Sequence, residues 1–226
     1  MEIAEVWRYP VKSMAGERMG AADVGLGGLA HDRGVAVFDR HSRRPEHPLS
    51  SRHHPGLLGF RASFEGGEVA ISGPDLIGAR WGEPAVRERV SEACRREIEI
   101  ACVEGGAFDD SPVHLVFLPT VAAVGQELLR RVDHRRFRAN VYIAGPEFVP
   151  GTERSWVGRQ FAVGGARLLA TAECPRCAMT TVDPDSLEVW PALLRHLAST
   201  KDAMMGLYCQ VLAPGRLEEG ARLRLL

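Results

Sequence analysis

Short β-prone segments, each ended by Gly, Pro or Asp, place the tightest limit on how this chain can fold. We predict strands over 2–9, 34–39, 57–64, 68–73, 99–103, 113–118, 137–145, 161–173, 206–213 and 221–226. The sequence "EGG" at 65–67 predicts a tight hairpin turn between two of them. Because strands outnumber helices and do not alternate with them, the pattern favours a β-rich α+β fold, in which barrels and folded-over sheets are common.

A few short helices are predicted between the strands. They cover residues 83–98, 120–132 and 190–198. In the first of these, Val86, Val90 and Cys94 recur at helical spacing, and Pro84 is suited to a first helical turn. The apolar residues of this segment are therefore expected to face a core.

The length of 226 residues allows one large domain or two small ones. A Gly- and Asp-rich stretch at 104–112 is the predicted boundary, which divides the chain into residues 1–104 and 105–226. The net charge of −1 gives no overall field that would attract nucleic acid or an anionic membrane. No apolar run approaches the ~18 residues of a membrane span. We therefore expect a cytoplasmic protein that binds neither nucleic acid nor membranes.

Five cysteines are an odd number for a disulfide framework, and reduced thiols fit this chain better. Two of them, Cys174 and Cys177, lie in the run "ECPRCAMTTVDPD". Their spacing allows a zinc half-site, a redox dithiol, a single metal ligand with a neighbour, or two ordinary buried cysteines. These four interpretations make different demands on the surrounding sequence.

A zinc site needs four ligands, and the chain has no second C-x-x-C motif. A thioredoxin-like pair needs its first cysteine at a helix N-terminus, whereas β-branched Thr180, Thr181 and Val182 predict a strand and turn. The polar neighbours, including Arg176, suit the edge of a site better than a core. An arginine beside a thiol also favours the thiolate form. Residue chemistry thus favours one thiolate metal ligand at a strand edge, without naming the metal.

Basic residues are almost all arginine. Of the 28 Lys and Arg residues, only Lys12 and Lys201 are lysines, which leaves 28 − 2 = 26 arginines. A lone arginine therefore carries little information, whereas Lys12 stands out. The histidine-rich stretch 31–54 is interpreted as a solvated loop, with His53 and His54 as rim candidates; the alternative is that its Arg and His side chains rim the substrate entrance.

The run "CPRCAMTTVDPD" closely resembles the signature of MOSC domains, which bind the molybdenum cofactor in the mitochondrial amidoxime-reducing component and at the C-terminus of the molybdenum cofactor sulfurase. Other stretches resemble the family in the same order. They are "VWRYPVKSMAGE" (6–17), "HDRGVAVFD" (31–39), "DDSPVHLV" (109–116), "RFRANVYIAG" (136–145) and the terminal segment 206–226. The resemblance implies a MOSC β-barrel fold, with an N-terminal β-barrel region over 1–104 and the MOSC domain over 105–226.

The resemblance also implies a molybdenum cofactor (Mo-molybdopterin) and its binding residues. Cys177 inherits the role of metal ligand and catalytic residue, while Lys12 and Ser13 match the pair that binds the cofactor phosphate. The other matching cofactor positions are Arg33, Ser111, Arg138 and Asn140, with Thr180, Thr181 and Asp183 holding the Cys177 loop. Two departures from the family pattern bear on local geometry and substrate: Asp110 replaces a threonine, and Ser186-Leu187 replaces Thr-Gly.

The function implied by the resemblance is reduction of N-hydroxylated or N-oxygenated small molecules. Electrons are expected from a separate ferredoxin- or flavoprotein-like protein, because the chain lacks four cysteines at cluster spacing. No membrane anchor and no requirement for pyridoxal phosphate are expected. The alternative is a sulfur-carrier or cofactor-handling module that uses Cys177 as a persulfide or cofactor ligand. A domain that kept the fold and lost the metal is a third possibility, which the intact motif residues disfavour.

Overall fold

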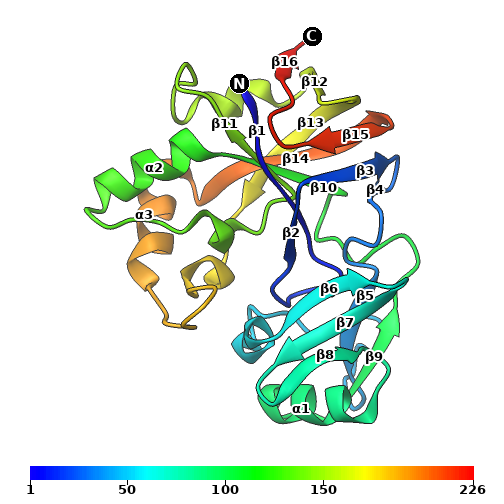
Figure 1. The fold of residues 1–226 in the computed structure, drawn as a ribbon. Helices are drawn as coiled ribbons and strands as arrows, with labels where there is room; N and C mark the ends of the chain where they lie inside the picture. Colours follow the sequence, from blue (N-terminus) through cyan, green and yellow to red (C-terminus); the bar gives the residue numbers. More distant parts are fainter.

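The computed structural model describes residues 1–226, which form a larger and a smaller β-rich body (Figure 1). The larger body contains an eight-stranded sheet in the order β16-β12-β13-β14-β10-β11-β1-β2 and a three-stranded sheet in the order β15-β3-β4. All neighbouring strands of these sheets run antiparallel except β10 and β11, which are parallel. The strands are β1 (Glu2–Arg8), β2 (Glu17–Met19), β3 (Ala21–Gly25), β4 (Gly28–Leu29), β10 (Val113–Phe117), β11 (Val141–Ala144), β12 (Gln160–Val163), β13 (Ala166–Pro175), β14 (Met204–Ala213), β15 (Gly215–Glu218) and β16 (Leu223–Leu225).

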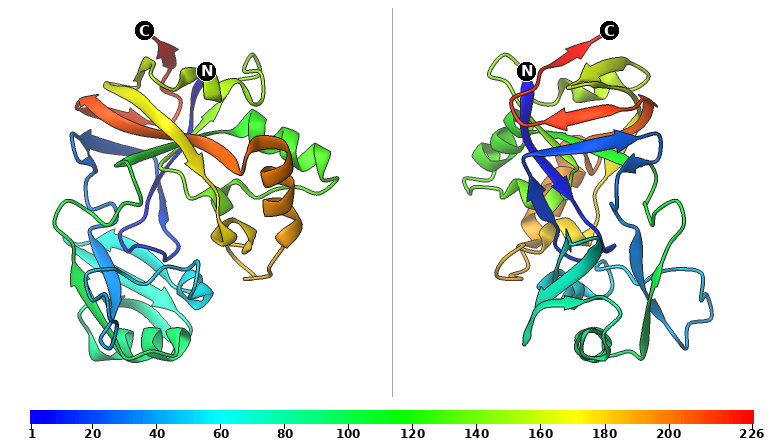
Figure 2. Two further views of the ribbon diagram at one scale, coloured as in Figure 1. Left: turned by 180° about the vertical axis from the view of Figure 1, so that it is seen from behind. Right: turned by 45° about the vertical axis from the view of Figure 1, so that its right-hand side comes forward.

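In the smaller body, β5 pairs with β9, and β6, β7 and β8 form a second sheet in that order. Its elements are β5 (Val35–Asp39), β6 (Arg61–Glu65), β7 (Glu68–Gly73), β8 (Leu76–Arg80), α1 (Pro84–Cys94) and β9 (Ile98–Cys102). Two further helices, α2 (Leu118–Glu127) and α3 (Pro191–Lys201), lie beside the larger sheet in Figure 1. Both views of Figure 2 place the smaller body at one end of the larger body. None of the helices has the length and apolar character needed to cross a membrane.

The core of the larger body draws on both ends of the chain. Ile3, Ala22 and Leu29 belong to the same cluster of 22 buried residues as Leu207 and Leu223. Strand β3 pairs with β15, and β1 pairs with β11, so these N-terminal strands are joined to this body by backbone hydrogen bonds. The division at residues 104 and 105 stays a prediction about sequence units. In space, residues before 105 contribute to the cores of both bodies.

The smaller body follows its local sequence signals closely. Val86, Val90 and Cys94 of α1 are buried in a cluster of 14 residues, which confirms the predicted apolar face. Glu65 and Glu68 pair across the β6–β7 hairpin, whose two loop residues, Gly66 and Gly67, have φ of 59° and 87°. Positive φ at both positions is what a two-residue type I′ turn requires, and glycine adopts it without steric cost.

Several predicted strand limits were wrong because tight turns interrupt the β-prone runs. The segment 161–173 is a hairpin of β12 and β13, and 57–64 opens as a 3₁₀ helix at Pro55–Gly59. Strand β11 starts only at Val141, after a 3₁₀ turn. Most important for the site, the residues after Cys177 form the 3₁₀ helix Ala178–Thr181 rather than the predicted strand. Hydrogen bonds from the Thr180 and Val182 amides to the carbonyls of Cys177 and Met179 close these turns.

Candidate functional site

A cavity of about 440 Å³ opens where the two bodies meet, and most of the predicted site residues line it. The predicted residues in its wall are Lys12, Ser13, Arg33, Ser111, Arg138, Asn140 and Cys177. They come from the loops that follow β1 and β4 and from the segments next to β10, β11 and β13. Segments far apart in the sequence therefore converge on one pocket. Thr180, Thr181 and Asp183 do not line this cavity.

Cys177 lies just beyond the end of β13 and is the N-cap residue of the following 3₁₀ helix. Its side chain is partly exposed, whereas Cys174 is buried, and both cysteines line the cavity. The Arg176 guanidinium donates a hydrogen bond to the Cys174 sulfur at 2.8 Å and another to the Phe137 carbonyl at 2.9 Å. Cys177 is thus the thiol available to a ligand, while Cys174 is tied into the wall.

The loop after Cys177 is fixed by the residues predicted around it. The Thr181 hydroxyl donates to the Ala178 carbonyl at 2.7 Å, and Thr180 is fully buried. Arg136 donates to the Thr181 carbonyl at 2.8 Å and to the Asp183 carboxylate at 2.7 Å. Burial raises the pKa of Asp183, but hydrogen bonds and the charge of Arg136 outweigh it, so the net pKa is lowered. These side chains position the loop from outside the cavity.

Arg138 is a nearly buried cation that has no partner within the protein. Its residue is 9% exposed, and its guanidinium makes no ion pair and donates no hydrogen bond to any protein group. It lies over the Tyr9 ring, with 4.4 Å between the guanidinium carbon and the ring centroid. Burial lowers the pKa of Arg138 to about 10. A buried charge in this state favours an anion that enters the cavity.

Asp32 and Asn140 form a hydrogen-bonded hub that holds Arg33. Asp32 is buried, accepts a hydrogen bond from the Tyr9 amide at 2.7 Å, and forms an ion pair with Arg33. The Asn140 amide donates to the Trp7 carbonyl at 3.3 Å and to Asp32 at 3.0 Å. Its oxygen accepts from the His114 amide at 3.1 Å and from Arg33 at 3.3 Å. The Asn140 side chain is fully used within the protein, so it positions Arg33 and the adjacent strands.

Three cavity residues have backbone conformations that side-chain-bearing residues rarely adopt. Ser13, Arg33 and Arg138 have φ of 70°, 52° and 54°. Left-handed backbone at a non-glycine residue costs of order 1–2 kcal/mol and gathers at functional sites. The convergence of three such residues on one pocket indicates that the fold maintains strain there to aim these side chains.

Lys12 and Ser111 are each held at the cavity wall by a neighbouring carboxylate. The Lys12 ammonium donates to the Ala107 carbonyl at 2.7 Å and to Asp109 at 2.5 Å. Burial raises the pKa of Asp109, but Lys12, Arg33 and Arg52 lower it by more. The Ser111 hydroxyl donates to Asp110 at 2.7 Å.

Sequence reasoning named Arg176 only as a neighbour of the thiols and did not assign Asp32 or Arg52 to the site. Asp32 stands directly before Arg33 in the quoted "HDRG" run, so the adjacent pair of opposite charges was an available signal. Arg52 lines the cavity, and the neighbouring Cys177 raises the pKa of Arg52. Nothing in the arginine-rich background of this chain distinguished it. His54 lines neither this cavity nor the recess next to it, whereas His53 lines that recess.

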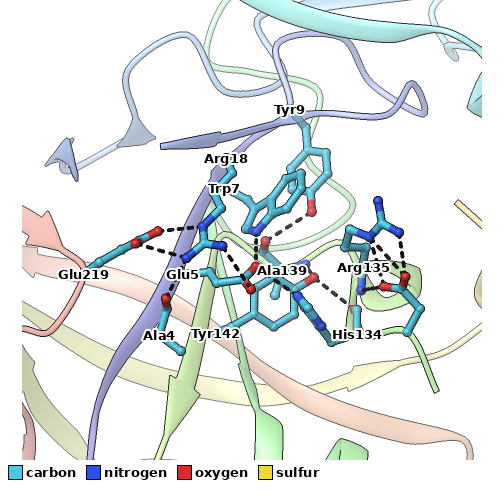
Figure 3. Close-up of polar contacts among 11 residues, drawn as sticks. Ala4, Glu5, Trp7, Tyr9, Arg18, His134, Arg135, Ala139, Tyr142 and Glu219 are labelled. Carbon is cyan, nitrogen blue, oxygen red and sulfur yellow. Dashed lines mark hydrogen bonds and ion pairs between the residues drawn. The ribbon is translucent and has the colours of Figure 1, made fainter. Parts of the chain in front are cut away.

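A polar network behind the cavity supports the strands that carry the site (Figure 3). Glu5 accepts hydrogen bonds from the Trp7 indole at 2.6 Å and from His134 at 2.9 Å. Tyr142 donates to the His134 carbonyl at 3.1 Å and accepts from the Ala139 amide at 3.0 Å. This network locks the backbone on both sides of Arg138, because Ala139 follows it directly in the chain.

Thiol reactivity provides a first check of this geometry. Burial raises the pKa of Cys94 to about 11 and raises the pKa of Cys209 further. We expect iodoacetamide at pH 7.5 to label the exposed Cys102 and the partly exposed Cys177 first, since the thiolate is the reactive form. Peptide mass spectrometry over a time course measures this order. Labelling of Cys209 before Cys177 would contradict the structure.

Family models match almost the whole chain. The MOSC domain model matches residues 102–224, and the model of the MOSC N-terminal beta barrel domain matches residues 1–98. This chain belongs to the MOSC domain family. The MOSC fold expected from the motifs is thereby confirmed.

Relatives of known name agree with this assignment. The chain is 32% identical to mitochondrial amidoxime reducing component 2 of Rattus norvegicus and 32% identical to mitochondrial amidoxime-reducing component 1 of Homo sapiens. Each match covers 81% of this chain and 67% of the relative. The YUAD protein of Bacillus subtilis shares the fold, with a TM-score of 0.54 at 16% identity over 98% of this chain and 93% of that chain. The cytoplasmic location expected from the sequence stays a prediction.

Proposed function

We propose that this MOSC protein is a molybdenum-cofactor-dependent reductase of N-oxygenated small molecules, supplied with electrons by a separate redox protein. The observation that carries the proposal is the unpartnered, nearly buried Arg138 in a cavity that also presents the Cys177 thiol. An anion and a soft metal are the two ligands that these groups favour. A pterin that carries both a phosphate and a thiolate-bound metal combines them in one molecule.

The donor set of the cavity fits such a group. Its lining contains five cationic side chains (Lys12, Arg33, Arg52, Arg138 and Arg176) and three carboxylates (Asp109, Asp110 and Glu173). Two of the carboxylates are engaged already, Asp109 by Lys12 and Glu173 by Arg154. A volume of about 440 Å³ is in the range of small-molecule and cofactor sites. The cavity thus offers excess positive charge, polar donors and one available thiol.

Each cavity residue has a defined task in this proposal. Lys12 and Ser13 would bind the phosphate, and the arginine fork of Arg138 would grip an anionic oxygen with parallel N–H bonds. Arg33, held by Asp32, would supply a second oriented guanidinium. Cys177 would be the protein ligand to molybdenum. When bound, the cofactor supplies the redox centre that the protein itself lacks.

The relatives' names support the choice of substrate class. Amidoximes are N-hydroxy compounds, and their reduction takes up two electrons and two protons, breaks the N–O bond and releases water. The chain's own contribution is to orient the substrate next to Cys177 and to hold the cofactor in a fixed position. The electrons come from outside, and a ferredoxin- or flavoprotein-like donor is the class we propose.

The test is the molybdenum and pterin content of protein made in a host that synthesises the cofactor. We expect near-stoichiometric metal, by elemental mass spectrometry, and near-stoichiometric pterin, by fluorescence after release. The Cys177→Ala variant should lose molybdenum and keep most of the pterin, because the cationic residues remain. Cys102→Ala is the matched control, since Cys102 is an exposed thiol outside the cavity. Wild-type protein without metal or pterin would refute the proposal.

A sulfur-carrier or cofactor-handling module is the second candidate, and the partial exposure of Cys177 favours it equally. Turnover separates the two functions. A reductase loaded with cofactor converts N-hydroxy compounds with reduced viologen as electron source. A carrier gives no turnover and shows a persulfide on Cys177 by intact mass.

A further inference from the structure

An outer recess of about 330 Å³ adjoins the cofactor cavity. The two hollows share the lining residues Lys12, Ser50, Arg52, Phe108 and Asp109. The far wall of the outer recess is built by the loop 46–53, which contributes His47 and His53. A molecule in this recess can therefore reach the cavity in which Cys177 lies.

Arg52 is presented to both hollows by a well-fixed turn. Its amide donates to the Ser50 hydroxyl at 3.2 Å, and the amides of His53 and His54 both donate to the Ser50 carbonyl at 2.9 Å. Just before the turn, the Leu49 amide donates to the Val37 carbonyl at 2.7 Å, which ties the loop to β5. The guanidinium thus extends from an ordered backbone.

Arg52 is also the one arginine of the outer recess, and no carboxylate pairs with it. Lys12 is paired with Asp109 at 2.5 Å, and His47 lies 3.3 Å from Glu46. Arg52 lines the inner cavity together with Cys177. A guanidinium has five N–H donors, so most of them stay available beside the proposed reaction centre.

We infer that the outer recess binds the substrate and that Arg52 selects N-oxygenated compounds that carry a carboxylate. This inference rests on the proposed function and adds the substrate class to it. Arg52 is exposed at the mouth, whereas Arg138 is nearly buried in the inner cavity, so the two arginines face different ligands. Phe108 lines both hollows and gives an aromatic ring of the substrate an apolar wall. A carboxylate on Arg52 would hold the substrate in the recess that shares a wall with the cavity of Cys177.

The test compares two probes that differ in one charge, benzamidoxime and 4-carboxybenzamidoxime, with reduced viologen as electron source. We expect Arg52→Gln to raise KM for the carboxylate probe about tenfold, because a charge-assisted hydrogen bond is lost at a partly solvated site. The readout is the ratio of the KM values for the two probes, and Arg52→Lys should restore part of the change in this ratio. Arg43→Gln is the matched control, since Arg43 is exposed in the same segment between β5 and Pro55 and lines neither hollow.

Three results would overturn the inference: equal changes in KM for both probes, no change for either, or loss of pterin from Arg52→Gln. The last would assign Arg52 to the cofactor. Calorimetric titration of the cofactor-loaded protein with 4-carboxybenzamidine, the reduction product, separates this inference from the proposed function. Binding that depends on Arg52 without turnover of either probe would leave the anion site standing and refute the reductase. Turnover without any dependence on Arg52 would support the reductase and refute the carboxylate site at Arg52.

Discussion

Replacing Asp32 with alanine is expected to lower the free energy of unfolding by about 3–5 kcal/mol. Asp32 is 3% exposed and neutralises Arg33, whose guanidinium also donates to the Arg138 carbonyl at 3.2 Å. The variant leaves a mostly buried cation without its partner and also removes the acceptor of the Tyr9 amide and of Asn140. Breaking one side of a buried pair costs far more than the pair itself contributes, since the remaining charge keeps its desolvation penalty.

Urea titration measures this loss, with Asp23→Ala as the matched control. Asp23 pairs with Arg216 at 3.2 Å on the exposed surface, and a surface pair of this kind contributes about 0–1 kcal/mol. A double-mutant cycle identifies the cause. If the unpaired Arg33 is responsible, Asp32→Ala costs much less in an Arg33→Ala background. An equal cost in both backgrounds would contradict this explanation and assign the loss to the hydrogen bonds of Asp32 alone.

Local sequence signals predicted the elements that depend on local forces. The glycine pair at 66–67 specifies its hairpin by φ alone, and the apolar spacing of α1 specifies which face is buried. The pairing of β1 with β11, and of β3 with β15, could not be predicted in this way. It depends on long-range pairing, and no residue within a short strand states which partner that strand will have.

The cavity was predicted through motif resemblance, but the partners of its charges were not. Lys12, Arg33 and Arg138 were named from the sequence. The sequence does not state that Asp32 neutralises Arg33 and that no carboxylate neutralises Arg138. Both residues have left-handed backbone, so the distinction arises from what the fold places beside each side chain: Asp32 lies against Arg33, and no carboxylate pairs with Arg138. Two arginines of one cavity therefore have opposite energetic roles.

The second large effect follows from this difference. We expect Arg138→Met to raise the free energy of unfolding of the cofactor-free protein by roughly 1–3 kcal/mol, because it removes an unpaired buried charge and keeps its apolar stem. At pH 7 this cost is fully present. Burial holds the folded-state pKa of Arg138 at about 10, below its ordinary value, so the cost is full below pH 10 and falls as the pH rises toward the pKa of the unfolded state. In the same variant, cofactor affinity should fall by about 100-fold or more, since two charge-assisted bonds to an anion are lost.

Stability and cofactor content should therefore change in opposite directions in Arg138→Met. Arg33→Met is the matched contrast, since it leaves Asp32 buried without its cation and should lower both quantities. Thermal unfolding of cofactor-free protein and pterin fluorescence of protein from the cofactor-producing host measure the two effects separately. A destabilised Arg138→Met variant would mean that Arg138 serves the fold. A stabilised variant with full pterin content would mean that the anion binds elsewhere. Only a gain in stability together with a loss of pterin is consistent with an arginine whose partner is the cofactor.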